Sequence, residues 1–204
     1  MNIIFDLCGP IIKIDITLID KKLQSFGVKC EEPYLALYRA GLTKQFESAQ
    51  ISPADFAEAA RRVLSAHFTD DQLWEAWNTL VTEFNPEHVT TIRRLHDQGV
   101  RTFILSNSDV VNAVFFKEEL NRRAGFDFTG TCFDEVMFSC QFGCRKPSPE
   151  IFQKILSRHQ LLADETFFID DCEKHCLGAA SVGLRTHWLH NGETIEDVVA
   201  SQKF

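Results

Sequence analysis

The chain has no long hydrophobic run and no surplus of positive charge, and both absences narrow what it can be. None of its apolar stretches is long enough to cross a bilayer as a helix. It has 21 lysines and arginines against 29 aspartates and glutamates, for a formal net charge of -8, and its arginine pairs are scattered along apparent helices. Nucleic-acid binding depends on clustered cations. We therefore expect neither a membrane protein nor a nucleic-acid-binding protein.

Export signals and paired cysteines are missing as well. The first residues enter an apolar, strand-like run without a cationic stretch or a cleavage site. The seven cysteines are odd in number and include no CxxC pair. Repeats and low-complexity tracts are also missing. These features favour a cytoplasmic protein with reduced thiols, as a monomer or homodimer.

What is present is an alternation of short apolar runs with helical segments. The 204 residues, 45% of them hydrophobic, can bury one substantial core and leave length for an inserted module. The runs that predict strands are residues 2–5, 101–105, 136–138, 166–169 and 185–189. The segments that predict the intervening helices are residues 109–121, 149–159, 173–182 and 193–201. This alternation is typical of an α/β fold, a Rossmann-like, doubly wound parallel sheet with helices on both faces.

The stretch between the first two strands has a helical pattern throughout. Ser52-Pro53 and Thr69 are typical helix starts, and the stripe that follows Thr69 predicts a helix continuing through Leu80 to Phe84. A further helix is predicted from Asn85 to about residue 98. We therefore predict an α/β core of residues 1–13 and 85–204, with an all-helical cap of residues 14–84 inserted into it.

Polar residues stand at the ends of three predicted strands. Asp6 follows the first strand, Ser106-Asn107 the second, and Asp170-Asp171 the strand near residue 168. Each has an ordinary interpretation as a turn or helix-capping residue, as Lys146 does as a loop lysine. Because a parallel sheet gathers its carboxyl ends into one crevice, these residues are expected to form one polar site. A carboxylate, a hydroxyl, an ammonium and an acidic pair in one place can perform phosphoryl chemistry.

Four segments resemble the motifs of the haloacid dehalogenase superfamily, and the resemblance covers essentially the whole chain. They are Phe5-Asp6-Leu7-Cys8-Gly9, Leu105-Ser106-Asn107, Cys144-Arg145-Lys146-Pro147-Ser148-Pro149-Glu150-Ile151-Phe152 and Phe168-Ile169-Asp170-Asp171. Residues 50–56 are similar to a branch that includes sugar-phosphate phosphatases and the phosphatase half of epoxide hydrolases. The resemblance implies a Mg²⁺-dependent phosphomonoester hydrolase that acts on a small phosphorylated metabolite such as a sugar phosphate.

The same resemblance implies a role for each residue of the predicted site. Asp6 is expected to attack phosphorus and form an aspartyl-phosphate. Ser106 and the backbone N–H of Asn107 are expected to bind the phosphoryl group, and Lys146 to neutralise its charge. Mg²⁺ is expected to be held by a set of oxygen ligands. These ligands are Asp6, the backbone carbonyl of Cys8, Asp171, and Asp170 directly or through water.

Cys8 departs from the superfamily pattern, because most of its phosphatases have a second aspartate there that acts as general acid and base. A thiol is a much weaker acid than a carboxyl group. Asp15, at the entry to the cap, is one conceivable substitute. We therefore expect an enzyme that is slow, or that prefers esters whose leaving group needs little protonation.

Two other functions compete with this interpretation. A ligand-binding or regulatory protein with little or no activity is one alternative, motivated by Cys8 and Pro10. A 2-haloacid dehalogenase is another, although the chain lacks a tyrosine near the nucleophile and has only Arg39 as a cap arginine ahead of Arg61. A zinc site is also conceivable by ligand type. Its ligands would be Cys8, Cys172, His175 and Cys176.

The aromatic residues of the predicted cap fall on helical stripes, so most are expected to form its core. These residues are Phe46, Phe56, Trp74 and Trp77. Tyr34, Tyr38 and Arg39 are the candidates for facing a substrate.

Overall fold

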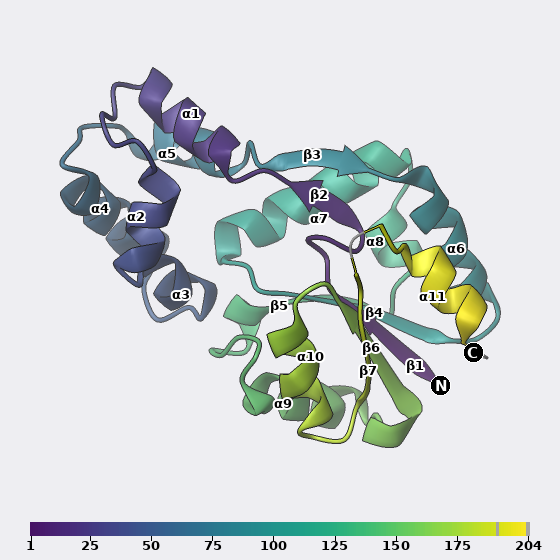
Figure 1. The fold of residues 1–204 in the computed structure, drawn as a ribbon. Coiled ribbons are helices and arrows are strands. Elements are labelled where there is room, and N and C mark those ends of the chain that lie inside the picture. Colours follow the sequence, from purple (N-terminus) through teal and green to yellow (C-terminus); the bar gives the residue numbers. More distant parts are fainter. Residues whose placement is uncertain (191, 203–204) are drawn as a thin grey trace.

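A computed structural model describes residues 1–190 and 192–202, and within them a five-stranded parallel sheet forms the centre of the molecule (Figure 1). Its strands lie in the order β5-β4-β1-β6-β7. Their bounds are β1 Asn2–Phe5, β4 Arg101–Ser106, β5 Glu135–Phe138, β6 Thr166–Asp170 and β7 Arg185–Trp188. Every pairing in this sheet is parallel. The α/β parallel-sheet fold predicted from the sequence is confirmed.

Helices cover both faces of the sheet, as the doubly wound arrangement requires. Their bounds are α6 Pro86–Asp97, α7 Val110–Ala124, α8 Phe128–Thr131, α9 Pro149–His159, α10 Glu173–Ala180 and α11 Ile195–Ser201. Buried residues of α6, α7, α8 and α11 share one apolar cluster, and those of α9 and α10 share the other. Alternate residues of β1 divide between them, with Ile3 and Phe5 in one cluster and Ile4 in the other.

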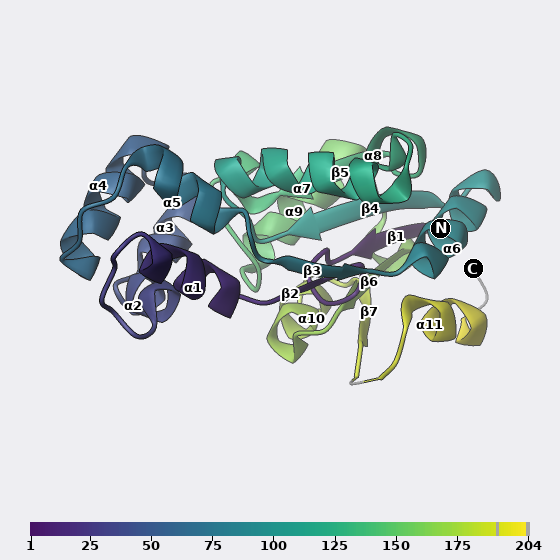
Figure 2. The same cartoon turned by 90° about the horizontal axis from the view of Figure 1, so that it is seen from above.

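A second group of helices lies at one end of the sheet (Figures 1 and 2). In the sequence these helices come between β2 (Ile12–Ile14) and β3 (Val81–Phe84). They are α1 Thr17–Ser25, α2 Pro33–Arg39, α3 Leu42–Glu47, α4 Pro53–Leu64 and α5 Asp70–Trp77. Capping boxes begin α4 at Ser52 and α5 at Thr69, which confirms both predicted helix starts. Phe46 stacks on Phe56, with ring centroids 4.5 Å apart, in the core of this group. We call α1–α5 the helical group.

The predicted helix from residue 70 to Phe84 is wrong beyond Trp77. Residues Val81–Phe84 form β3, which pairs antiparallel with β2 and carries the chain into and out of the helical group. β3 forms because Ile12–Ile14 offers a strand partner, which the local pattern does not reveal. The predicted division at residues 13/14 and 84/85 stays a prediction.

Residues 1–190 and 192–202 also include two short 3₁₀ segments, Ser139–Gln141 after β5 and Ala163–Glu165 before β6. Among the described residues, no helix is both long and apolar enough to traverse a lipid bilayer.

Candidate active site

The carboxyl ends of three neighbouring strands meet at one point, because β1 lies between β4 and β6. Asp6 follows β1, and its backbone N–H donates to Ile169 of β6 at 2.8 Å. Ser106 is the last residue of β4, and Asp170 is the last residue of β6. The sheet thus brings together residues that are up to 164 positions apart in the sequence.

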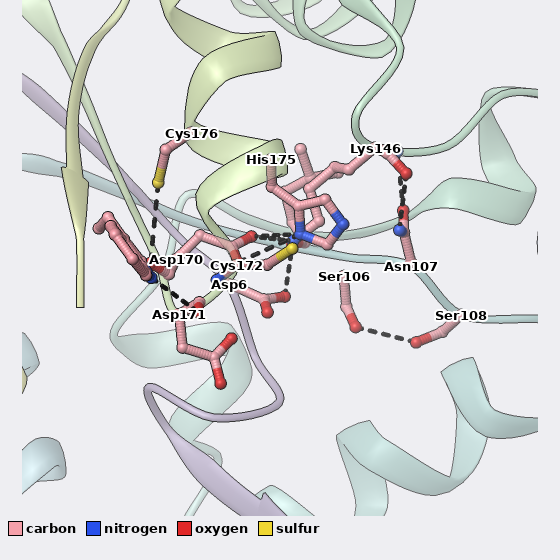
Figure 3. Close-up of polar contacts among 12 residues, drawn as sticks. Asp6, Ser106, Asn107, Ser108, Lys146, Asp170, Asp171, Cys172, His175 and Cys176 are labelled. Atoms are coloured by element: carbon pink, nitrogen blue, oxygen red, sulfur yellow. Dashed lines mark hydrogen bonds and ion pairs between the residues drawn. The ribbon is translucent and has the colours of Figure 1, made fainter. Parts of the chain in front are cut away.

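Lys146 lies at the centre of this group, with 1% of its side chain exposed (Figure 3). Its Nζ is 2.7 Å from Asp6 Oδ1 and 2.7 Å from Asp170 Oδ2, and it donates to the carbonyl of Leu105 at 3.0 Å. The Asn107 side chain holds the Lys146 backbone at both ends. Its amide donates to Lys146 O at 3.0 Å, and its oxygen accepts from Lys146 N at 2.9 Å. A buried ammonium that bridges two carboxylates is firmly oriented.

The site carries more negative than positive charge. Carboxylate oxygens of Asp6, Asp170 and Asp171 lie within 4.8 Å of one another. Burial raises the pKa of Asp6, and the Lys146 ammonium opposes that rise. Burial and then Asp170 raise the pKa of Asp171, with which no cationic side chain of the described residues forms an ion pair. Lys146 and His175 hold the pKa of Asp170 below its usual value, although burial acts to raise it.

This donor set fits a hard divalent cation, which would offset the excess negative charge. The backbone at Gly9 passes close to the Asp171 carboxylate. A Cβ built on Gly9, at φ +112°, would lie 2.1 Å from Asp171 Oδ2. Only glycine leaves room for the Asp171 carboxylate in its observed place. Asp170 is already bonded to Lys146, to His175 Nδ1 at 3.0 Å and to the Cys172 N–H at 2.8 Å. Its oxygens are therefore less available to a metal than those of Asp171.

Ser106 and Cys8 lie beside the carboxylates. Ser106 is 1% exposed, and its Oγ is 2.9 Å from Ser108 Oγ. The Cys8 thiol contacts Ser106, and burial raises its pKa well above the usual range. Asp15, the conceivable substitute acid, is bonded to Thr17 and is absent from the cavity wall.

The four residues of the conceivable zinc site are not brought together. Cys176 Sγ faces the backbone carbonyls of Asp170 and His187, at 3.7 and 3.4 Å. Asp170, Cys172 and His175 do have ligand atoms within 4.8 Å of one another, but His175 Nδ1 is engaged with Asp170. The seven cysteines are free thiols.

A cavity of about 230 Å³ opens above Asp6, between the sheet and the helical group. Tyr34 lines it as expected, whereas Tyr38 and Arg39 do not. Trp77, assigned to the core of the cap, also lines it. The wall contains further polar residues that sequence reasoning did not assign to the site, among them Glu47, Asp109 and Arg145. The sequence offered a signal for two of them, because Arg145 adjoins Lys146 and Asp109 begins a helix. It offered no signal for Glu47.

A family model described as haloacid dehalogenase-like hydrolase matches residues 2–183. Among curated proteins, the D-ribitol-5-phosphate phosphatase of Bacteroides thetaiotaomicron is 25% identical over 195 residues, which cover 94% of this chain and 92% of that protein. The glyceraldehyde 3-phosphate phosphatase of Pyrococcus furiosus is 31% identical over 107 residues, which cover 52% of this chain and 42% of that protein.

Among solved structures, a family enzyme of Bacteroides thetaiotaomicron, in complex with magnesium and inorganic phosphate, matches with a TM-score of 0.85 and 26% identity. The match covers 97% of this chain and 98% of that one. A predicted hydrolase of Porphyromonas gingivalis also has a TM-score of 0.85 and 26% identity, over 98% of this chain and 96% of its own. Sequence family and fold agree along nearly the whole length, and the chain belongs to the haloacid dehalogenase-like hydrolases.

Proposed function

We propose that the chain is a Mg²⁺-dependent phosphomonoester hydrolase that acts on a small phosphorylated metabolite. The observation that carries this proposal is the contact between Asp6 and Lys146. A carboxylate at a strand end faces an open cavity while a buried ammonium lies 2.7 Å from it. The similarity to a sugar-alcohol phosphate phosphatase and to a structure holding magnesium and phosphate supports the same chemistry.

Asp6, Asp171 and the backbone carbonyl of Cys8 are the proposed ligands of Mg²⁺, with Asp170 acting through water because Lys146 and His175 already bind it. When bound, Mg²⁺ offsets the charge of the phosphoryl group and of the carboxylates around it. Lys146 contributes a second positive charge at a fixed position. Such preoriented charge is a large part of phosphoryl-transfer catalysis.

The chemistry divides into two displacements. A carboxylate oxygen of Asp6 bonds to phosphorus as the ester P–O bond breaks, and the leaving oxygen takes up a proton. Water then attacks the aspartyl-phosphate, which releases phosphate and restores the carboxylate. The proposed role of Ser106 is to donate a hydrogen bond to a phosphoryl oxygen. The thiol of Cys8, whose pKa burial raises, is a poor proton donor, so esters with stable leaving anions should react best.

The helical group is proposed to act as the cap, with residues 14–84 forming it and residues 1–13 and 85–204 forming the core. Its residues Tyr34, Glu47 and Trp77 line the cavity opposite Asp6. The cavity volume of about 230 Å³ is below the range of roughly 300–1,000 Å³ that is usual for drug-sized ligands. A sugar phosphate or similarly short metabolite is therefore the proposed class of substrate.

The test is phosphate release from an aryl phosphate and a panel of sugar phosphates, with and without Mg²⁺. Asp6→Asn should lower turnover by at least about a thousandfold. Asp15→Asn, the same change at a half-buried position outside the cavity, should leave it nearly unchanged. Turnover without Mg²⁺, or turnover that survives Asp6→Asn, would contradict the proposal. No phosphate release by the parent would favour a ligand-binding protein, and halide release from a 2-haloacid would favour a dehalogenase.

A further inference from the structure

One ion pair in the cavity wall has no part in the phosphoryl chemistry. Glu47, the last residue of α3, has its Oε2 2.8 Å from Nε of Arg145. The two residues come from opposite sides of the cavity, since Glu47 belongs to the helical group and Arg145 precedes Lys146 in the core. Both line the cavity that contains Asp6.

The position of Glu47 is tied to the phosphoryl site by hydrogen bonds. Ser139, which follows β5, donates through Oγ to the backbone carbonyl of Glu47 at 2.7 Å. The same Oγ accepts from the N–H of Ser108 at 3.0 Å, and Ser108 Oγ is 2.9 Å from Ser106 Oγ. The end of α3 is therefore held at a fixed place relative to Ser106. A ligand bound through Ser106 would meet Glu47 in a defined geometry.

The pair has hydrogen-bonding capacity that the protein leaves unused. Glu47 Oε2 and Arg145 Nε are both buried, and neither has an aligned hydrogen-bond partner among the described residues. The side chains are nonetheless 16% and 25% exposed. That exposure must lie on their other atoms, which include the second carboxylate oxygen and the terminal guanidinium nitrogens. A ligand hydroxyl that reaches these exposed atoms can accept from the guanidinium and donate to the carboxylate.

The charge of the wall decides which substrates it tolerates. Glu47 offsets the charge of Arg145, and the wall holds a second carboxylate at Asp109. Burial raises the pKa of Tyr34 well above its usual range, so its phenol stays neutral. A second anionic group on a substrate would meet two carboxylates and an arginine that is already paired. Unpaired charge in a partly buried site is strongly unfavourable.

We propose that Glu47 and Arg145 form a hydroxyl-binding subsite that selects phosphate esters of neutral polyhydroxy compounds and rejects esters that also carry a carboxylate. Glu47 does so by occupying the arginine that a substrate carboxylate would otherwise bind. This inference rests on the proposed function and deepens it, because it names the class of alcohol that the phosphatase accepts.

The experiment compares two ligands of equal chain length. Glycerol 3-phosphate ends in a hydroxymethyl group, and 3-phosphoglycerate has a carboxylate in its place. Their dissociation constants are measured by titration calorimetry with Mg²⁺ in the Asp6→Asn background, where turnover is at least about a thousandfold lower. The pH is about 8.5, at which Glu47 is ionised although burial raises its pKa to about 7. Glycerol 3-phosphate should bind at least about tenfold more tightly. Adding Glu47→Gln should reduce that ratio by about tenfold or more, because Arg145 becomes available to the carboxylate. Glu58→Gln, on the exposed face of α4, should leave the ratio unchanged.

An unchanged ratio in Glu47→Gln, or tighter binding of 3-phosphoglycerate by the Glu47-containing protein, would overturn the subsite. If Glu47→Gln does not fold, as judged by circular dichroism, Arg145→Gln serves instead. This variant should bind glycerol 3-phosphate about tenfold more weakly than the Asp6→Asn background does, and it should bind 3-phosphoglycerate no more tightly. If the variant and the background bound each ligand with the same affinity, the inference would be overturned. Mg²⁺-dependent release of phosphate by the parent tests the proposed function separately, so the two can fail independently.

Discussion

The indole N–H of Trp77 donates to the Asp109 carboxylate at 2.8 Å. This bond joins the end of α5 to the N-terminus of α7, where Asp109 also accepts from the backbone of Val111 and Asn112. Asp109 is 2% exposed, and its pKa is raised by burial. The helical group is therefore attached to the core through a buried, fully bonded carboxylate beside the cavity.

Removing this donor should destabilise the protein. Trp77→Phe leaves a buried oxygen of Asp109 without its partner, which is expected to lower the free energy of unfolding by about 1–3 kcal/mol. Urea unfolding measures the change. Trp74→Phe is the matched control, because the Trp74 indole forms no hydrogen bond among the described residues and only stacks on Phe46 and Phe56. Equal losses in the two variants would show that the bond to Asp109 contributes little.

Gly9 should be required for metal binding. A Cβ at this position would overlap the Asp171 carboxylate, so Gly9→Ala should displace it and weaken Mg²⁺ binding by at least about tenfold. Titration calorimetry with Mg²⁺ measures the affinity. Gly143→Ala separates this effect from backbone strain, because Gly143 also has positive φ, at +68°, yet nothing lies within 4 Å of its Cβ position. Similar Mg²⁺ affinities in both variants would argue against Asp171 as a ligand.

Restoring a carboxyl group at Cys8 should change which leaving groups react. With saturating Mg²⁺, Cys8→Asp is expected to accelerate hydrolysis of alkyl phosphates by about 10- to 100-fold, because a positioned acid protonates the leaving alkoxide. Aryl phosphates, whose leaving anions are stable, should gain much less. Phosphate release from both ester types gives the comparison, and Cys8→Ser should gain with neither. Equal acceleration of the two types would mean that protonation of the leaving group does not limit the parent.

Glu47 should make stability depend on pH. Burial raises its pKa to about 7, against the opposing charges of Arg145 and Lys146 and with a further upward contribution from Asp109. A carboxyl group whose pKa is higher in the folded state binds more protons there, so its contribution weakens stability as pH rises from about 4.5 to 7. Glu47→Gln lacks this slope. The free energy of unfolding of Glu47→Gln minus that of the parent should therefore increase by about 1–3 kcal/mol from pH 5 to pH 8.

Thermal or urea unfolding of parent and variant at several pH values checks this expectation. Arg145 loses its partner in Glu47→Gln at every pH, so the slope rather than the absolute stability carries the test. Glu58→Gln, at an exposed position on α4, should follow the parent at all pH values. A constant difference between parent and Glu47→Gln would mean that Glu47 titrates normally.

The centre of the sheet could be predicted because β1, β4 and β6 are buried on both faces and therefore appear as largely apolar runs. β1 and β4 are such runs, and each ends in a polar residue, Asp6 or Ser106. Parallel pairing then forces those ends together, and a distinctive segment around Lys146 adds the ammonium. The helix starts at Ser52 and Thr69 were equally local, since capping involves residues within one turn.

Local pattern failed where the stabilising partner lies far along the chain. Val81–Phe84 continues an apolar stripe that suits a helix, yet it forms β3 because β2 supplies its hydrogen bonds from about 70 positions away. Sequence alone thus determined the family, the sheet and the acidic site at its strand ends. Only the tertiary structure determined which residues form the cavity wall above that site, where Glu47 pairs with Arg145 and Trp77 donates to Asp109. These contacts arise when separately packed units dock, and no local sequence pattern predicts that docking.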